Sequence, residues 1–246
     1  MIQLSVNVNK VATLRNSRGG AIPSVLDAVR VCVDAGVPGI TVHPRADARH
    51  ITATDVREVA ALLRTLTRHV EFNIEGDPRP DLLALVHEVK PTQCTLVPVR
   101  PGEITSQAGW ASDTPREEIG PVVRDLRARG VRVSLFVDPE ERPIRWAAEM
   151  AADRVELYTE PFARAFERGA EQARRSFELY MEAARLARSL GLGVNAGHDL
   201  DLENLILFRE LPHLDEVSIG HAIVSRALFV GLSTVVREYL GVLKTV

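Results

Sequence analysis

Residues 131–159 read VRVSLFVDPEERPIRWAAEMAADRVELYT and contain one complete unit of strand, helix and strand, the pattern from which the fold class can be inferred. The β-branched apolar run over 131–138 is typical of a strand, and residues 139–150 place apolar side chains at helical spacing. A second apolar run follows over 154–159. This order of strand, helix and strand predicts two parallel strands that are joined by a helical crossover.

The same unit recurs in both directions along the chain. Apolar runs that we expect to form strands occupy 2–8, 39–43, 70–75, 93–99, 131–138, 154–159, 192–196 and 216–220. Helical spacing covers 24–35, 53–67, 80–89, 115–129, 139–150, 167–190, 201–211 and 222–243, with Thr52 and Thr114 as expected N-caps. Eight such pairs close a barrel, whereas five or six would favour an open sheet. The sequence therefore predicts an α/β fold, a (β/α)8 TIM barrel in which residues 1–246 form a single domain.

Composition excludes several classes of protein. The net charge of −3 is too close to zero for a nucleic-acid-binding protein. No apolar run is long enough to cross a membrane, and the first ten residues lack the pattern of a signal peptide, so a cytoplasmic location is expected. Cys32 and Cys94 lie in apolar segments without metal or redox spacing, and we expect both thiols to be reduced and buried. No metal and no cofactor are expected.

Catalytic residues of such barrels lie at the C-terminal ends of the strands and in the loops that follow. Four of the seven histidines fall there, namely His43, His50, His198 and His221. One histidine in such a place is often structural, but four on one rim are hard to explain in that way. Because histidine titrates near neutrality, such a cluster is suited to repeated proton transfer.

Two glutamates are also expected near this rim. Glu75 ends an apolar strand, where burial of a carboxylate is costly unless the group is paired or functional. It is either a general base with a raised pKa or the partner of Arg45 or Arg18 in a salt bridge. Glu156 lies inside the sixth strand and either takes part in catalysis or anchors a polar layer of the barrel.

Two segments have features of phosphate-binding sites. Residues 218–222 read SIGHA and place Gly220 at the start of the last helix, where backbone N–H groups can bind an anion. Residues 15–20 read RNSRGG and form an expected loop in which Arg18 can bind phosphate and the glycines allow close approach. With Arg45 on the same rim, the two segments predict small substrates that carry two phosphate groups in total.

Eight motifs together resemble the pyridoxine 5′-phosphate synthase family. They are NVNKVATLRNSRGG, GITVHPRADARHIT, FNIEG, TLVP with a later ITS, RVSLFVD, RVELYT, VNAGH and SIGHAIVSRAL, and they span residues 6–228 in order. The resemblance implies condensation of 3-amino-2-oxopropyl phosphate with 1-deoxy-D-xylulose 5-phosphate, with release of phosphate and water and without a redox cofactor. It also implies a homo-oligomer, a ring of dimers.

The resemblance implies a role for individual residues. His43 and Glu75 match proton acceptors, His198 matches a proton donor, and Glu156 matches a carboxylate that stabilises a transition state. The matches to positions that bind the aminoketone phosphate are Asn7, Arg18, Gly220 and His221, and those to positions that bind the deoxyxylulose phosphate are Arg45, His50 and Thr105.

The chain departs from the common family pattern at three places. Asn9 and Lys10 stand where many members have Asp and His, and Asp199 stands where a glycine is common. We expect all three residues to contact substrate. Residues 160–162 replace a turn that contains glycine. None of these changes removes an expected acid–base group, so activity is expected.

Three other functions are compatible with the same residues. A Schiff-base aldolase would use Lys10, which is one of only three lysines. A metal-dependent epimerase would use His43, Glu75 and His198, although no two of them have a local ligand spacing. A non-catalytic barrel would only bind a sugar phosphate. The long segment 100–113 is expected to act as a lid. The aromatic segment 162–180, an expected extension of the sixth helix, would pack on a neighbouring subunit or on the barrel itself.

Overall fold

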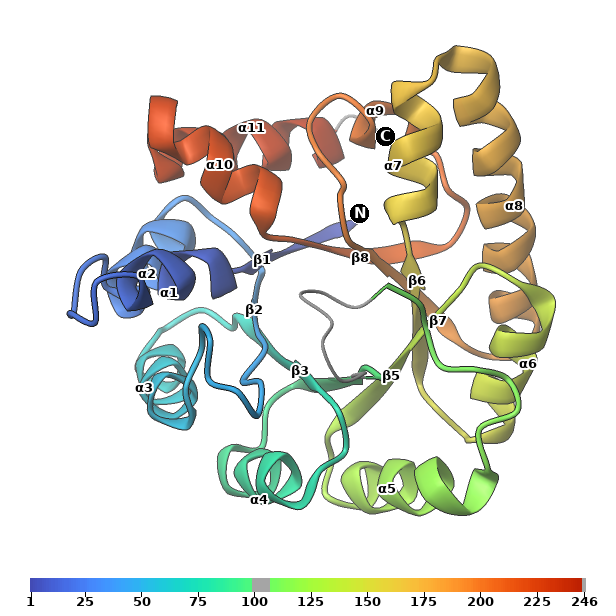
Figure 1. The fold of residues 1–246 in the computed structure, drawn as a ribbon, viewed down its shortest axis with the longest axis horizontal. Helices are drawn as coiled ribbons and strands as arrows, with labels where there is room; N and C mark the ends of the chain where they lie inside the picture. Colours follow the sequence, from blue (N-terminus) through green and yellow to red (C-terminus); the bar gives the residue numbers. More distant parts are fainter. Residues whose placement is uncertain (99–106, 245–246) are drawn as a thin grey trace.

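A computed structural model describes residues 1–98 and 107–244, and its strands form a closed parallel barrel (Figure 1). The strand order is β1-β2-β3-β4-β5-β6-β7-β8, with β8 paired to β1. This confirms the predicted (β/α)8 TIM barrel. The strands are β1 (Gln3–Asn7), β2 (Gly39–Val42), β3 (Glu71–Gly76), β4 (Gln93–Leu96), β5 (Arg132–Val137), β6 (Arg154–Tyr158), β7 (Gly193–Gly197) and β8 (Leu214–Ile219).

The helices form a ring around the strands (Figure 1). They pack apolar faces against the barrel, whose strands are buried on both sides as expected for parallel strands covered by helices. The helices are α1 (Asn9–Asn16), α2 (Val25–Asp34), α3 (Ala53–Arg64), α4 (Pro80–Val89), α5 (Arg116–Ala128), α6 (Glu141–Glu149), α7 (Glu160–Glu167), α8 (Ala170–Ser189), α9 (Leu205–Phe208), α10 (His221–Val230) and α11 (Leu232–Lys244).

Helix capping agrees with the sequence at one site and differs at another. The Thr52 side chain accepts a hydrogen bond from the Asp55 backbone N–H, and the Asp55 carboxylate accepts one from Thr52 N, which completes a capping box. Arg15 reaches the same carboxylate from α1, with Nη1 2.5 Å from Oδ1. The predicted Thr114 cap is wrong, because Pro115 is the N-cap residue of α5 and has no side-chain oxygen.

Four predicted segments differ from the structure. The expected loop at 15–20 is partly helical, because α1 begins directly after β1 and runs to Asn16. The expected helix over 167–190 begins late, as α8 at Ala170, because Gly169 has a φ of 119°, and a further helix that was not expected, α7, precedes it. The expected helix over 222–243 is broken at Gly231, which has a φ of 87°. Both glycines adopt backbone conformations that a helix interior does not permit. The expected helix over 201–211 is reduced to the single turn of α9.

The aromatic segment over 162–180, which belongs to α7 and α8, packs on its own barrel. Phe162 is fully buried, and its ring centroid lies 5.0 Å from that of Phe208 and 6.0 Å from that of Tyr180. The Tyr180 hydroxyl donates a hydrogen bond of 2.6 Å to the carbonyl of Tyr158 on β6. These contacts fix the outer helices to the strand that carries Glu156, so the second of the two expected packing modes is observed.

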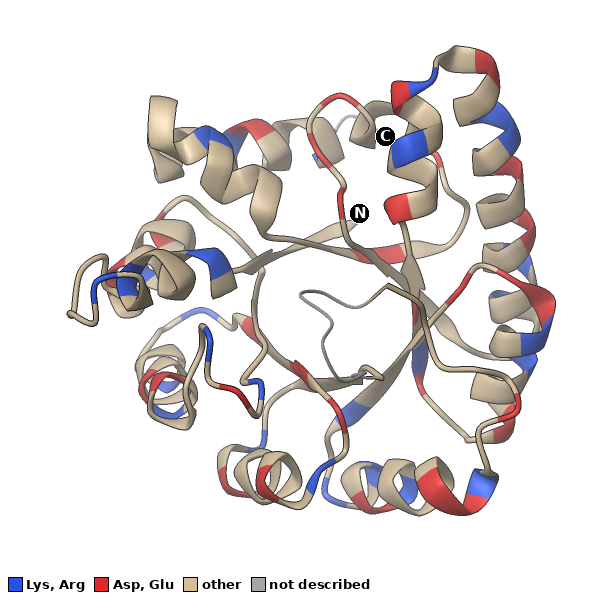
Figure 2. Ribbon diagram, viewed as in Figure 1, with Lys and Arg blue, Asp and Glu red and all other residues tan. Residues whose placement is uncertain are grey.

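The outer helices carry charges of both signs. Lys and Arg alternate with Asp and Glu over the outer helices (Figure 2). No described helix combines the length and apolar character that a membrane span requires.

Candidate active site

A cavity of about 300 Å³ lies at the C-terminal ends of the strands. It brings together residues that lie at the ends of, or directly after, β1, β2, β3, β4, β6, β7 and β8, as the barrel predicts. The expected site residues that line it are Asn7, Asn9, Lys10, His43, Arg45, His50, Glu75, Glu156, His198, Asp199, Gly220 and His221.

Two expected site residues are not placed in the cavity. Arg18 lies exposed on the turn that follows α1, outside the set of described residues that line the cavity. Thr105 lies outside the described residues, as does the first half of the expected lid, residues 100–106. Several lining residues were not among the predicted site residues, namely Thr13, Arg49, Val97, Leu200, Ser218, Ile219 and Ala222. Ser218 and Ala222 flank the recognised Gly220, which was the available signal.

Glu75 and His43 face each other at the ends of β3 and β2. The distance between His43 Nδ1 and Glu75 Oε2 is 4.0 Å, and both side chains are about nine-tenths buried. Oε2 of Glu75 accepts a hydrogen bond of 3.3 Å from Asn7, and Oε1 accepts one of 3.4 Å from Ser218. Arg45 forms an ion pair with Asp47. The described partners of Glu75 are neutral amide, hydroxyl and imidazole groups, which does not support the alternative of a salt bridge with arginine.

Burial shifts the pKa values of this pair in opposite directions. Desolvation, with a smaller contribution from the charge of Glu216, raises the pKa of Glu75 to about 8. Desolvation, followed by the positive charges of His50 and Arg45, lowers the pKa of His43 to about 3. At neutral pH the pair is a neutral imidazole beside a carboxyl group that holds a proton for much of the time. The proton of this pair therefore lies on the carboxyl group rather than on the imidazole.

Asn9 holds the backbone of His43 in place. Its Oδ1 accepts a hydrogen bond of 2.9 Å from His43 N, and its own N–H donates to Asn7 Oδ1 at 3.0 Å. The amide thus links the ends of β1 and β2, and this role needs an oxygen acceptor rather than a negative charge. Lys10 is exposed at the start of α1 and lines the cavity.

His198 lies against an aromatic wall. Its ring centroid is 4.9 Å from that of Phe136 and 5.4 Å from that of Tyr158. The enclosure explains why desolvation lowers the pKa of His198 to about 4, with a further lowering by Lys10 and an opposing contribution from Glu160. His198 and Asp199 both have positive φ, at 83° and 57°. No local sequence pattern indicated this strained turn.

Glu156 lies deeper in the barrel. Desolvation and the charges of Glu75 and Glu216 raise its pKa well above the ordinary value, although a hydrogen bond with Thr95 opposes this effect. Oε2 has no hydrogen-bond partner among the described residues. A Cβ atom on Gly197 would collide with Oε1, so glycine at this position leaves room for the carboxyl group.

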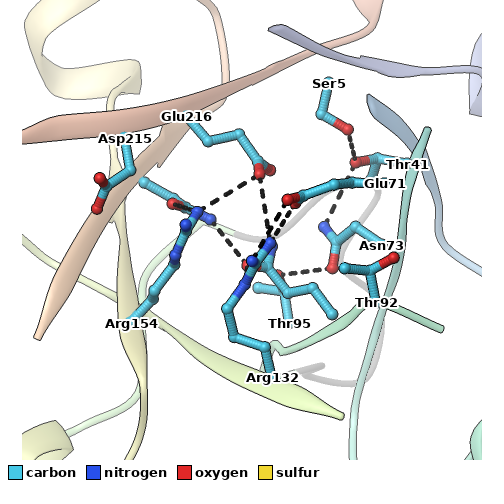
Figure 3. A network of polar contacts seen from close by, with 12 residues as sticks. Ser5, Thr41, Glu71, Asn73, Thr92, Thr95, Arg132, Arg154, Asp215 and Glu216 are labelled. Carbon is cyan, nitrogen blue, oxygen red and sulfur yellow. Dashed lines mark hydrogen bonds and ion pairs between the residues drawn. The ribbon is translucent and has the colours of Figure 1, made fainter. Parts of the chain in front are cut away.

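A polar network fills the barrel near the start of its strands (Figure 3). Glu216 lies between two arginines, with Oε2 3.6 Å from Arg154 Nη1 and 4.0 Å from Arg132 Nη2. Arg132 also pairs with Glu71 and donates to Gln93 Oε1 at 2.8 Å. Even so, desolvation raises the pKa of Glu216 to about 7. Three buried carboxyl groups, Glu75, Glu156 and Glu216, therefore influence one another along the barrel.

The N-terminus of α10 can bind an anion. Gly220 is its N-cap residue, and a Cβ atom there would lie 2.8 Å from the carbonyl oxygen of Asn7. Only glycine allows this approach of β1 and β8, which places the first N–H groups of the helix at the cavity. In the described part of the chain, no group of three or more His, Cys, Asp or Glu side chains is arranged to hold a metal ion.

Comparisons with known proteins identify a family. The family model described as pyridoxal phosphate biosynthesis protein PdxJ matches residues 4–245. The pyridoxine 5′-phosphate synthase of Christiangramia forsetii is 50% identical over 245 residues and covers 99% of this chain and 100% of its own. That of Bacteroides fragilis is 49% identical over 245 residues, with 99% and 100% coverage.

The similarity to solved structures concerns the fold. Phosphoribosyl anthranilate isomerase from Thermotoga maritima superposes with a TM-score of 0.64 at 13% identity and covers 100% of both chains. The family match over nearly the whole length and the relatives at half identity are far more specific. This chain belongs to the family of the pyridoxal phosphate biosynthesis protein PdxJ.

Proposed function

We propose that this chain catalyses the pyridoxine 5′-phosphate synthase reaction. In that reaction 3-amino-2-oxopropyl phosphate condenses with 1-deoxy-D-xylulose 5-phosphate and closes a pyridine ring, with release of phosphate and water. The observation that carries the proposal is the meeting of His43, Glu75 and His198 with the N-terminus of α10 in one cavity. The relatives that carry the name pyridoxine 5′-phosphate synthase align with this chain over their full length.

The two phosphates would bind at separate parts of the cavity. The N–H groups after Gly220, with Asn7 and His221, would hold the aminoketone phosphate. Arg45 and His50, together with Lys10, would hold the phosphate of the deoxyxylulose substrate. These groups are cationic, hydrogen-bond donors, or both, which is the complement of a phosphate. Family resemblance adds Arg18 to the aminoketone phosphate site and Thr105 to the deoxyxylulose phosphate site.

The proton transfers follow from the positions of the acid–base groups. The substrate amine attacks the ketone to form an imine, and His198 donates a proton to the departing hydroxyl group. Glu75 and His43 accept protons from carbon and oxygen as the phosphate leaves and the ring closes. Glu156 stabilises the charge that develops in the transition state. Because the pair His43–Glu75 is buried, each transfer takes place away from bulk water.

An exposed Lys10 favours phosphate binding over a Schiff base. A Schiff-base lysine needs a desolvated amine, whereas Lys10 lies at the surface of the first turn of α1. We also propose that the chain acts as one domain in the cytoplasm, as a homo-oligomer, on small phosphorylated substrates and not on nucleic acid.

The test is an assay of the purified protein with both substrates. Pyridoxine phosphate and inorganic phosphate should appear in equal amounts. Folded protein that forms neither product would overturn the proposal. Treatment with borohydride in the presence of substrate separates the alternatives, because covalent labelling of Lys10 would indicate an aldolase, and binding without labelling or turnover would indicate a non-catalytic barrel.

A further inference from the structure

The turn that carries His198 has an unfavourable backbone. His198 and Asp199 are consecutive non-glycine residues with φ values of 83° and 57°. L-residues rarely occupy this region, and such conformations persist where surrounding contacts determine them. The turn directly follows β7, and His198 and Asp199 both line the cavity. The contacts that hold this turn therefore also decide where the imidazole lies.

Thr159 supplies these contacts from the neighbouring strand. It is fully buried and directly follows β6. Its hydroxyl group donates to the Gly197 carbonyl at 2.7 Å and also lies within hydrogen-bond distance of the His198 carbonyl. Its backbone N–H donates to the Gly197 carbonyl at 3.0 Å. The hydroxyl therefore fixes the peptide plane that joins His198 to Asp199.

A second side chain holds the other end of the turn. Nδ2 of the buried Asn204 donates to the Asp199 carbonyl at 3.0 Å, and Asn204 Oδ1 accepts from Asp201 N at 2.9 Å. Asn204 thus fixes the peptide after Asp199, while Thr159 fixes the peptide before it. Both peptides of the left-handed turn are held by buried side chains.

The end of β6 also contributes to the surroundings of the His198 imidazole. Tyr158, the residue before Thr159, forms one wall of the aromatic enclosure around His198, and its ring stands at 82° to the imidazole. One strand end therefore supplies both the wall against which the imidazole packs and the hydroxyl that holds its backbone. If the peptide rotated, the imidazole would leave this wall and move away from the cavity.

We propose that Thr159 is a positioning residue, whose hydroxyl group holds the His198 turn so that the imidazole lies between Phe136 and Tyr158 and faces the cavity. The kinetic part of this proposal rests on the proposed function, in which His198 is the proton donor. The structural part does not, because the position of His198 can be measured without turnover.

The variants Thr159→Val and Thr159→Ser separate the hydroxyl from the packing. Valine keeps the shape and removes the donor, whereas serine keeps the donor. For Thr159→Val, kcat should fall about tenfold to a hundredfold, because a displaced catalytic group reacts from the wrong geometry, and KM should stay within about threefold. Thr159→Ser should keep most of the activity. A serine variant that loses as much kcat as the valine variant would overturn the proposal.

Thr65→Val is the matched control. The Thr65 hydroxyl also donates to a backbone carbonyl, that of Leu62 at 2.7 Å, but at the end of α3 and away from the cavity. This variant should leave kcat unchanged. An equal loss of kcat in Thr65→Val would show that the loss of any such bond is sufficient, and it would also overturn the proposal.

NMR of the empty protein gives the second readout. Ring currents of Phe136 and Tyr158 should displace the carbon-bound proton resonances of His198, and Thr159→Val should return them toward ordinary histidine values. Unmoved resonances together with an unchanged kcat would refute the positioning role. If the wild type lacks turnover, the proposed function fails while the NMR comparison still decides the role of Thr159. If the valine variant does not fold, Thr159→Ala carries the same readouts.

Discussion

His43 Nδ1 lies 4.0 Å from Glu75 Oε2, in a pair whose two members both favour their neutral forms. A histidine and a glutamate at this distance would often form an ion pair. Here burial raises the pKa of Glu75 to about 8 and lowers that of His43 to about 3, so neither charge is favoured near pH 7. The site thus holds a proton on the carboxyl group and a neutral imidazole beside it.

Glu75→Gln should separate activity from stability. Glutamine has the shape of the protonated carboxyl group but cannot accept a proton, so turnover should fall by orders of magnitude. Stability should change in the other direction. The folded-state pKa of Glu75 is raised to about 8, so its contribution to stability is present at low pH and is lost as the pH rises through that value.

The measurement is the Tm of wild type and variant as a function of pH. Glu75→Gln should match the wild type near pH ~4.5 and exceed it by at least about 4 °C at pH ~9. The exposed Glu182 on α8 provides the control, because Glu182→Gln should change neither the turnover nor this pH dependence. A Glu75→Gln protein with normal turnover would remove Glu75 from the mechanism.

Glu216→Gln should change the pH dependence of kcat/KM, although the Glu216 side chain does not contact substrate. The charge of Glu216 contributes to the raised pKa of Glu75, from a position among the arginines of the lower barrel (Figure 3). In the free enzyme, kcat/KM should rise with pH until Glu75 is ionised, near pH 8. Removal of the Glu216 charge should move this limb to lower pH. A limb that stays in place would show that Glu75 does not sense Glu216.

Phosphate binding should be accompanied by proton uptake. Desolvation and neighbouring cations lower the pKa of His50 and of His198 to about 4, so both imidazoles are neutral in the empty site at pH 7. A phosphate dianion placed beside them raises these pKa values. Calorimetric titration with inorganic phosphate, in two buffers with different ionisation enthalpies, should therefore show a heat that depends on the buffer. Equal heats would contradict the expected uptake.

The fold could be predicted from the sequence because the strands and most of the helices have a recognisable local pattern of apolar residues. The runs over 131–138 and 154–159, for example, end within one or two residues of β5 and β6. One error occurred where helical spacing continues across a break. Gly231 interrupts the pattern over 222–243, and its positive φ divides this range into α10 and α11.

The site could be predicted as a set of residues but not as a geometry. His43, Glu75 and His198 were recognisable because charged and titratable groups at the ends of buried strands are costly without a function. Ser218, which hydrogen-bonds Glu75 from a strand far away in the sequence, could not be inferred to do so. The same holds for Phe136 beside His198, since apolar residues in strands are ordinarily core.

Asn9 offers the sharpest test of the departure from the common family pattern. Its Oδ1 accepts the backbone N–H of His43 at 2.9 Å, and an aspartate at this position could accept the same hydrogen bond. Asn9→Asp should therefore keep kcat within about threefold, because the geometry of His43 is retained. It should raise KM for the phosphorylated substrates, since a negative charge is added to the cavity.

Asn9→Leu removes the acceptor and should lower kcat about tenfold or more, as the His43 imidazole shifts. Steady-state kinetics on the two variants decides the matter. Equal kcat for aspartate and leucine would show that the amide does not position His43.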